Sequence, residues 1–117
     1  MKQAPEQDTV CCPPEEPEWH EDSRPIEGPK ADEELAMLAK AIGHPARVRI
    51  LRLLSHKEAR VCSQIVGELP LAQSTVSEHL RILKEAGLIR SREDAPRVGY
   101  CINYEVLRRL KALVAII

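Results

Sequence analysis

Two adjacent cysteines, Cys11 and Cys12, are the most distinctive chemical groups in the first part of this 117-residue chain. Neighbouring Cα atoms lie ~3.8 Å apart, whereas a relaxed disulfide prefers a separation of ~4.4–6.8 Å. The pair is therefore better suited to bind one soft ion through two thiolates than to form a disulfide bond with itself. Because thiolates select soft metals and metalloids over hard, oxygen-loving cations, we expect a thiophilic role for these residues.

Two further cysteines, Cys62 and Cys101, lie in the more apolar part of the chain. The start of the sequence has no apolar core of a signal peptide, and no run approaches the ~20 apolar residues of a membrane span. We therefore expect a cytoplasmic protein whose cysteines are thiols or metal ligands rather than a disulfide framework. Cys62 alone is equally typical of a small buried side chain, and Cys101 is expected to be a strand residue with a free thiol.

Charge divides the chain into two parts. Residues 1–30 carry eight acidic side chains against three basic ones and hold six of the nine prolines. Such a segment has little to bury, so residues 1–31 are predicted to be a flexible acidic tail. The remaining 32–117 are predicted to form one domain, with fourteen Lys or Arg against ten Asp or Glu. A basic body suits a polyanionic partner such as nucleic acid, although a well-solvated surface explains the charge equally well.

Helical periodicity begins behind the tail. Apolar residues at helical spacing predict a helix from Asp32 to Ile42, which Gly43 ends. His44-Pro45 restarts a helix, because proline is tolerated at the first helical position; its apolar stripe is Val48, Leu51 and Leu54. A shorter third helix is predicted over residues 61–69, ending before Pro70.

The segment 71–87 is the most informative. Val76, Leu80 and Leu83 form one apolar stripe, while the opposite face near the start of the segment carries short hydrogen-bonding side chains and one cation: Gln73, Ser74, Thr75, Ser77 and Arg81. A short helix, a tight turn and a helix with this open polar face are typical of a DNA-reading helix-turn-helix. The alternative is an amphipathic helix with a solvated polar face.

A β-hairpin is expected after Gly87. Residues 88–92 alternate apolar and polar, residues 93–96 form a turn, and residues 97–102 return. Arg90, Arg92 and Arg97 lie near the tip, where they suit phosphates or the minor groove. A last helix from about Tyr104 is too apolar for a monomer's exposed terminal helix, so it and the 32–42 helix are expected to pack against a second copy. The predicted fold is mainly α with a β-hairpin wing, a homodimeric winged helix-turn-helix.

This order of elements resembles the ArsR/SmtB family of winged-helix repressors. The match lies in residues 41–51, AIGHPARVRIL, and in residues 73–89, QSTVSEHLRILKEAGLI. The resemblance implies a homodimeric repressor that binds double-stranded operator DNA and releases it when a metal or metalloid binds. It places Gln73, Ser74, Thr75, Ser77 and His79 in the major groove, with Arg81, Arg92 and Arg97 on phosphates. Ala72 stands where relatives usually have a helix-capping Ser, so Ser74, or Thr75 with Glu78, is expected to take over the cap.

The resemblance also suggests an effector. Cys62 occupies the second cysteine position of the family's helix motif, but Arg60 replaces the first, so that two-cysteine site is incomplete. Cys11, Cys12 and Cys62 together supply the three sulfurs that trivalent arsenic or antimony uses, as in relatives with N-terminal cysteines. The predicted inducer is therefore arsenite or antimonite, held within one subunit or across the dimer.

Other functions remain open. The same DNA-binding fold is compatible with a thiol redox switch in which Cys62 is oxidised with a tail cysteine, or with a sensor of cadmium, lead or another soft metal. The family's terminal-helix zinc site is absent, since residues 104–117 contain no Asp or His. An enzyme is not expected, because the sequence offers no nucleophile–base pair, phosphate-binding glycine loop or His-Glu metal motif.

Overall fold

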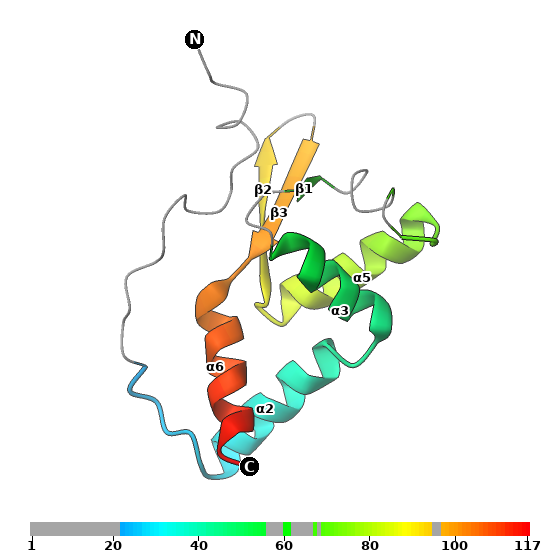
Figure 1. The fold of residues 1–117 in the computed structure, drawn as a ribbon. Helices are drawn as coiled ribbons and strands as arrows, with labels where there is room; N and C mark the ends of the chain where they lie inside the picture. Colours follow the sequence, from blue (N-terminus) through cyan, green and yellow to red (C-terminus); the bar gives the residue numbers. More distant parts are fainter. Residues whose placement is uncertain (1–21, 56–59, 62–66, 68, 95–96) are drawn as a thin grey trace.

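The computed structural model describes residues 22–55, 60–61, 67, 69–94 and 97–117. Its elements are α2 (Pro29–Ala41), α3 (Pro45–Leu54), β1 (Arg60–Val61), α5 (Gln73–Glu85), β2 (Ile89–Asp94), β3 (Arg97–Ile102) and α6 (Tyr104–Ala115). Figure 1 shows α2 and α6 side by side at one end of the molecule, the β2–β3 hairpin at the other end, and α3 and α5 between them. This is the mainly α architecture with a β-hairpin that the sequence predicts.

Helix α2 begins three residues before the predicted start. Gly28 has φ +107°, a left-handed conformation that costs glycine little, and Pro29 then occupies the first helical turn. Leu38 and Ala41 are buried. Helix α2 therefore includes three residues that the sequence analysis assigned to the tail, Pro29, Lys30 and Ala31.

Helix α3 starts as predicted. His44 is its N-cap, and its ring Nδ1 accepts a hydrogen bond from the backbone N–H of Ala46 at 3.0 Å, while Pro45 occupies the first turn. Leu54 from the predicted apolar stripe is buried. Ile50, which was not part of that stripe, is also fully buried, because α3 is covered by α5 and by β3 on adjacent faces.

The sheet has one more strand than the predicted hairpin. Its order is β1-β3-β2, with all neighbours antiparallel. Arg60 pairs with Tyr100 and Val61 with Gly99, so the prediction that a helix starts at Val61 is wrong. The reason is that β3 offers an open edge to which the backbone of residues 60–61 hydrogen-bonds. Most of the predicted third helix, residues 62–66 and 68, lies outside the described residues.

Helix α5 packs its predicted stripe into the core: Val76, Leu80 and Leu83 are each at most 1% exposed. Two backbone hydrogen bonds cap its C-terminus. The Gly87 N–H donates to the Lys84 carbonyl at 2.9 Å, and the Leu88 N–H donates to the Leu83 carbonyl at 3.0 Å. This is a Schellman motif, and it requires the left-handed φ of +87° that Gly87 adopts. The chain then enters β2 within two residues.

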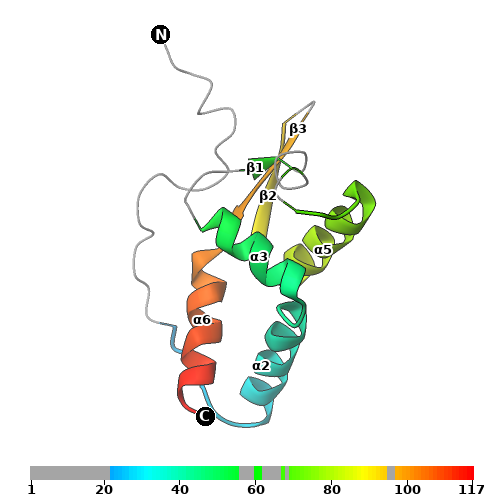
Figure 2. The same ribbon diagram turned by 45° about the vertical axis from the view of Figure 1, so that its right-hand side comes forward.

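Helix α6 contributes Leu110 and Leu113 to the same core, and Ile89 and Ile102 pair across the hairpin beneath it. Figure 2 shows the hairpin projecting beyond the helical body. Within the described part of the chain, no helix has the length and apolar character needed to cross a bilayer.

Candidate DNA-binding surface

The first turns of α5 present an open polar face. Its residues Gln73, Ser74, Thr75, Ser77 and Arg81 are all exposed, while Val76 and Leu80 between them are buried. The side chains near the helix start are short, so no bulky apolar group stands between this face and an incoming surface. The face therefore has the shape and chemistry of a helix that enters the major groove.

The start of α5 differs from the expected capping. The helix begins at Gln73 with Ala72 as its N-cap, and no side chain caps it. The expectation that Ser74, or Thr75 with Glu78, takes over the cap is therefore wrong. The carboxylate of Glu78 lies one turn further on and binds Arg81 instead of reaching back to the helix start.

Arg81 lies between two carboxylates of its own helix. Its Nε donates to Glu78 Oε1 at 3.0 Å, and its Nη1 lies 2.7 Å from Glu85 Oε2. These contacts raise the pKa of the Arg81 guanidinium, and the hydrogen bond from Arg81 lowers the pKa of the Glu78 carboxyl. The Arg81 side chain is half exposed, so water or a phosphate can replace the two carboxylates that hold it.

His79 lies on the inner side of α5 rather than with the exposed residues. It is 7% exposed, and its Nδ1 lies 3.0 Å from the Nη1 of Arg47 on α3. The imidazole of His44 packs against it with a ring-centroid separation of 4.5 Å. The structure therefore separates His79 from the polar face with which the sequence analysis grouped it.

The hairpin carries the other predicted basic residues. Arg92 pairs with Gly99 and Arg97 with Asp94 in the backbone register, which places both near the β2–β3 turn, and Arg90 is exposed further down β2. Residues 95 and 96 lie outside the described residues. The hairpin leaves the body directly after α5, as a wing does.

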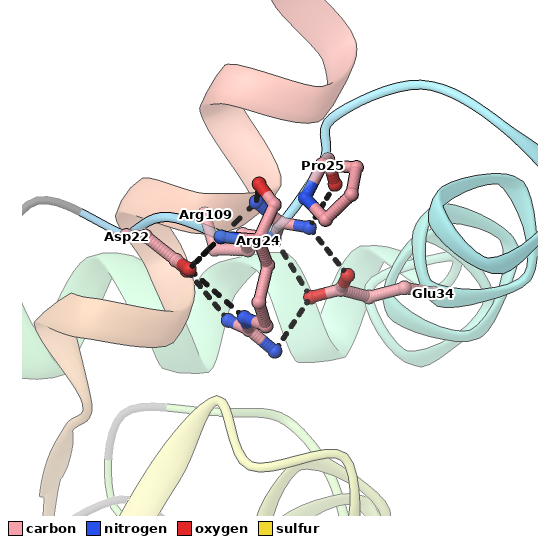
Figure 3. Close-up of polar contacts among 5 residues, drawn as sticks. All are labelled: Asp22, Arg24, Pro25, Glu34 and Arg109. Carbon is pink, nitrogen blue, oxygen red and sulfur yellow. Dashed lines mark hydrogen bonds and ion pairs between the residues drawn. The ribbon is translucent and has the colours of Figure 1, made fainter.

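At the opposite end of the molecule, Arg109 joins α6, α2 and the segment before α2 (Figure 3). Its Nε and Nη2 hold the two carboxylate oxygens of Glu34 at 3.0 and 2.9 Å, and it also donates to the backbone carbonyls of Arg24 and Pro25. The bond from Arg109 lowers the pKa of the Glu34 carboxyl, and the neighbouring Arg24 guanidinium lowers that of Asp22. We call Asp22, Arg24, Glu34 and Arg109 the tail clamp.

Of the four cysteines, the structure describes Cys101 alone. Cys11, Cys12 and Cys62 lie outside the described residues, so their predicted site is not placed. Cys101 lies on β3, is fully buried and is disulfide-bonded, so the expectation of a free thiol is wrong. Among the described residues, no three His, Cys, Asp or Glu side chains gather as metal ligands.

Comparison with known proteins identifies the fold. Residues 44–91, from the N-cap of α3 through the start of β2, match the family described as bacterial regulatory protein, arsR family. A helix-turn-helix transcriptional regulator of Methanocaldococcus jannaschii is 35% identical over 85 residues, which are 73% of this chain and 92% of that protein. The chain belongs to the ArsR family of transcriptional regulators.

Two other matches are a repressor of a known operon and a solved structure. The arsenical resistance operon repressor of Staphylococcus xylosus is 31% identical over 63% of this chain and 70% of its own length. The structure of reduced HlyU from Vibrio cholerae superimposes with a TM-score of 0.62 at 28% identity, over 74% of this chain and 92% of that one. The relatives and the fold are those of transcriptional regulators and not of enzymes.

The sequence analysis missed the contacts of Arg47 and Arg109 and the burial of His79. Arg47 and Arg109 each have another arginine within two positions in the sequence, and their partners lie 32 and 75 residues away. No local pattern marks such contacts. The burial of His79 did have a signal, because it directly precedes Leu80 and follows Val76 by three positions, on the edge of the apolar stripe.

Proposed function

We propose that this ArsR-family regulator is a homodimeric repressor that leaves its operator when arsenite or antimonite binds to cysteine thiolates. The observation that carries the DNA-binding part is the exposed polar face of α5, followed within a few residues by a basic hairpin. In this proposal Gln73, Ser74, Thr75 and Ser77 read base edges, and Arg81, Arg92 and Arg97 neutralise phosphates.

The proposed dimer forms through α2 and α6. Large apolar side chains remain exposed on these helices and at the chain end, namely Met37 at 49%, Val114 at 50% and Ile117 at 91%. Ile26 and Met37 also line a hollow of about 900 Å³ between the two helices and the segment before α2. Covering this face with a second copy would bury it, and a two-fold dimer presents two copies of α5 to half-sites about 34–36 Å apart.

The proposed inducer site uses Cys11, Cys12 and Cys62. Three thiolates match the needs of a trivalent metalloid, and the Staphylococcus xylosus relative is named for arsenical resistance. The tail clamp limits where the pair can act, because Asp22 is tied to the α2–α6 end of the molecule. Ten peptide units separate Cys12 from Asp22, so the pair reaches at most ~35 Å from the clamp.

The test is an anisotropy titration of the reduced protein on its own promoter DNA. Arsenite is expected to raise the dissociation constant of the wild type about 5- to 150-fold, the range of typical allosteric couplings. The variant Cys11→Ser/Cys12→Ser should bind DNA equally well and ignore arsenite. A matched control is Ser74→Ala, which should weaken DNA binding and leave the fold-change with arsenite intact.

Two results would contradict the proposal. Failure of the reduced protein to prefer promoter DNA over a scrambled duplex would remove the operator function. Equal release of the wild type and the double serine variant would remove the tail cysteines from the sensor. Titration of cadmium and lead on the same samples compares the other soft-metal sensors directly.

A second candidate function is a thiol redox switch, favoured by the disulfide at Cys101. Its partner is one of the remaining cysteines, and a dithiol reductant would break the S–S bond, donating two electrons and two protons to give two thiols. HlyU, a similar protein, has a structure described as reduced. In this alternative a dithiol reductant alone changes operator affinity, and Cys101→Ser abolishes the change; a response to arsenite in fully reduced protein favours the metalloid sensor.

A further inference from the structure

Arg47 connects three helices through one guanidinium group. It belongs to α3; its Nε donates to the Ala41 carbonyl at 2.6 Å and its Nη2 to the Lys40 carbonyl at 3.5 Å, both at the C-terminus of α2. Its Nη1 lies 3.0 Å from His79 Nδ1 on α5. The last carbonyls of a helix lack partners within the helix, so Arg47 satisfies that of Ala41 and shares that of Lys40 with the backbone N–H of Gly43, while it holds α5.

The contact fixes the protonation state of His79. A guanidinium carries five N–H donors and no acceptor, so His79 Nδ1 must accept, and the ring proton must be on Nε2. A ring protonated on both nitrogens cannot accept this bond and would place a second positive charge against Arg47. The link between α2 and α5 therefore exists only while the imidazole is neutral.

The surroundings of His79 favour that neutral state. The charged or titratable groups that face it are His44 and Arg47 from α3 and its N-cap, and Glu78 from its own helix. Burial, then His44 and Arg47, lower the pKa of His79 from 6.5, and Glu78 opposes this. The contact is accordingly complete above pH 6.5 and is lost as the pH falls through the lowered pKa.

We propose that Arg47 and His79 are positioning residues for operator binding, which hold the DNA-reading helix α5 at a set angle to the proposed dimer helix α2 as long as His79 Nδ1 is unprotonated. The inference rests on the proposed DNA binding through α5 and adds the residues that orient it. Because α2 is placed at the dimer axis, its angle to α5 sets the spacing of the two α5 helices. Protonation of His79 frees that angle and weakens binding to two half-sites.

The first experiment measures promoter affinity by anisotropy from pH 7.5 to 5.0 at constant ionic strength. The wild type should lose affinity severalfold over this range, with a slope no steeper than tenfold per pH unit for each His79, and so no steeper than a hundredfold per pH unit for the dimer. His79→Asn places an amide oxygen near the position of Nδ1, accepts from Arg47 at every pH and cannot titrate. Its promoter affinity should change much less between pH 7.5 and pH 5.0 than that of the wild type.

The matched pair for Arg47 is Arg47→Gln and Arg49→Gln. Both remove one positive charge from α3, but Arg49 is exposed. Arg47→Gln should weaken promoter binding about tenfold at pH 7.5, a typical coupling, and lose the pH dependence, whereas Arg49→Gln should keep the wild-type pH profile. Circular dichroism at each pH confirms that all variants remain folded.

A measurement without DNA separates this inference from the proposed function. NMR of the free protein should show His79 with its proton on Nε2 and a pKa below 6.5 that rises in Arg47→Gln. A proton on Nδ1, or an unchanged pH profile in His79→Asn, overturns the positioning role even if the protein is a repressor. The NMR titration can agree with these values while the protein does not prefer its promoter. In that case the contact between Arg47 and His79 exists, but its role in operator binding is overturned together with the proposed function.

Discussion

Arg109 and Arg81 make the same bidentate contact with a glutamate, one inside the molecule and one on its surface. The Arg109 side chain is 4% exposed and that of Glu34 is 22%, whereas Arg81 and Glu78 are 52% and 54% exposed. Water and salt compete with the exposed pair far more than with the buried one. The difference indicates that Arg109 stabilises the fold, while Arg81 is held loosely enough to exchange a carboxylate for a DNA phosphate.

The largest effect is expected from Arg109→Met. Removing the guanidinium leaves the partly buried Glu34 with only the longer ion pair to Arg24 at 3.6 Å and releases two backbone carbonyls. The free energy of unfolding should therefore fall by about 2–4 kcal/mol. Urea denaturation at pH 7 measures this change. Lys111→Met, exposed on the same helix, is the control and should differ little from the wild type; equal losses in both variants would show that the tail clamp does not stabilise the fold.

The next effect is the loss of the Arg109 contact in acid. The pKa of Glu34 is lowered from 4.5 by the hydrogen bond from Arg109. A carboxyl group with a lowered folded-state pKa contributes stability that is present above pH 4.5 and is lost as the pH falls through that lowered value. Urea denaturation at pH 5.5 and at pH 3 should therefore show a smaller acid loss for Glu34→Gln than for the wild type, and Glu33→Gln, exposed in the same turn, should keep the wild-type loss.

A smaller effect, on DNA rather than on stability, is expected from Arg81→Gln. If Arg81 moves to a phosphate in the complex, the slope of log affinity against log salt should decrease in magnitude by about one for each copy of the chain, and so by about two for the proposed dimer. Anisotropy titrations at several salt concentrations measure the slope. The urea midpoint should change much less than in Arg109→Met, and an unchanged salt slope would show that Arg81 stays with its carboxylates.

The smallest effect is expected from Glu85→Gln. This change removes one of the two carboxylates that hold Arg81 and one negative charge near the proposed DNA surface. Promoter affinity should rise about two- to threefold at low salt, and the gain should vanish as salt screens the charge. Asp32→Asn, an exposed acidic residue on α2, provides the control, and an equal gain there would indicate a general charge effect.

The elements set by local signals were predictable from the sequence. His44-Pro45 marks the start of α3 through a side-chain cap and a proline that needs no N–H, and the spacing of Val76, Leu80 and Leu83 defines the buried side of α5. The same stripe leaves Gln73, Ser74 and Thr75 exposed, so the candidate reading face could be located. Their contacts with DNA stay predictions.

The parts set by distant contacts were not predictable. Strand β1 exists because residues 60–61 meet the free edge of β3, some forty residues later in the chain. In the sequence, Arg47 and Arg109 cannot be told from the arginines near them, Arg49 and Arg108. The packing of α3 against α5 brings Arg47 to His79, and the packing of α2 against α6 brings Arg109 to Glu34. The Cys101 disulfide likewise depends on tertiary proximity that no spacing reveals.

The Schellman turn at Gly87 joins α5, the proposed DNA-reading helix, to the hairpin through a connection of three residues, 86–88. Leu88 is fully buried, its N–H is bonded to the last turn of α5, and its carbonyl accepts from Asn103 at the far end of β3. Helix α5 and the β2–β3 hairpin are therefore expected to move as one rigid unit. In the proposed complex, a tilt that withdraws α5 from the major groove would move the hairpin with it, so both sets of proposed contacts would be released together.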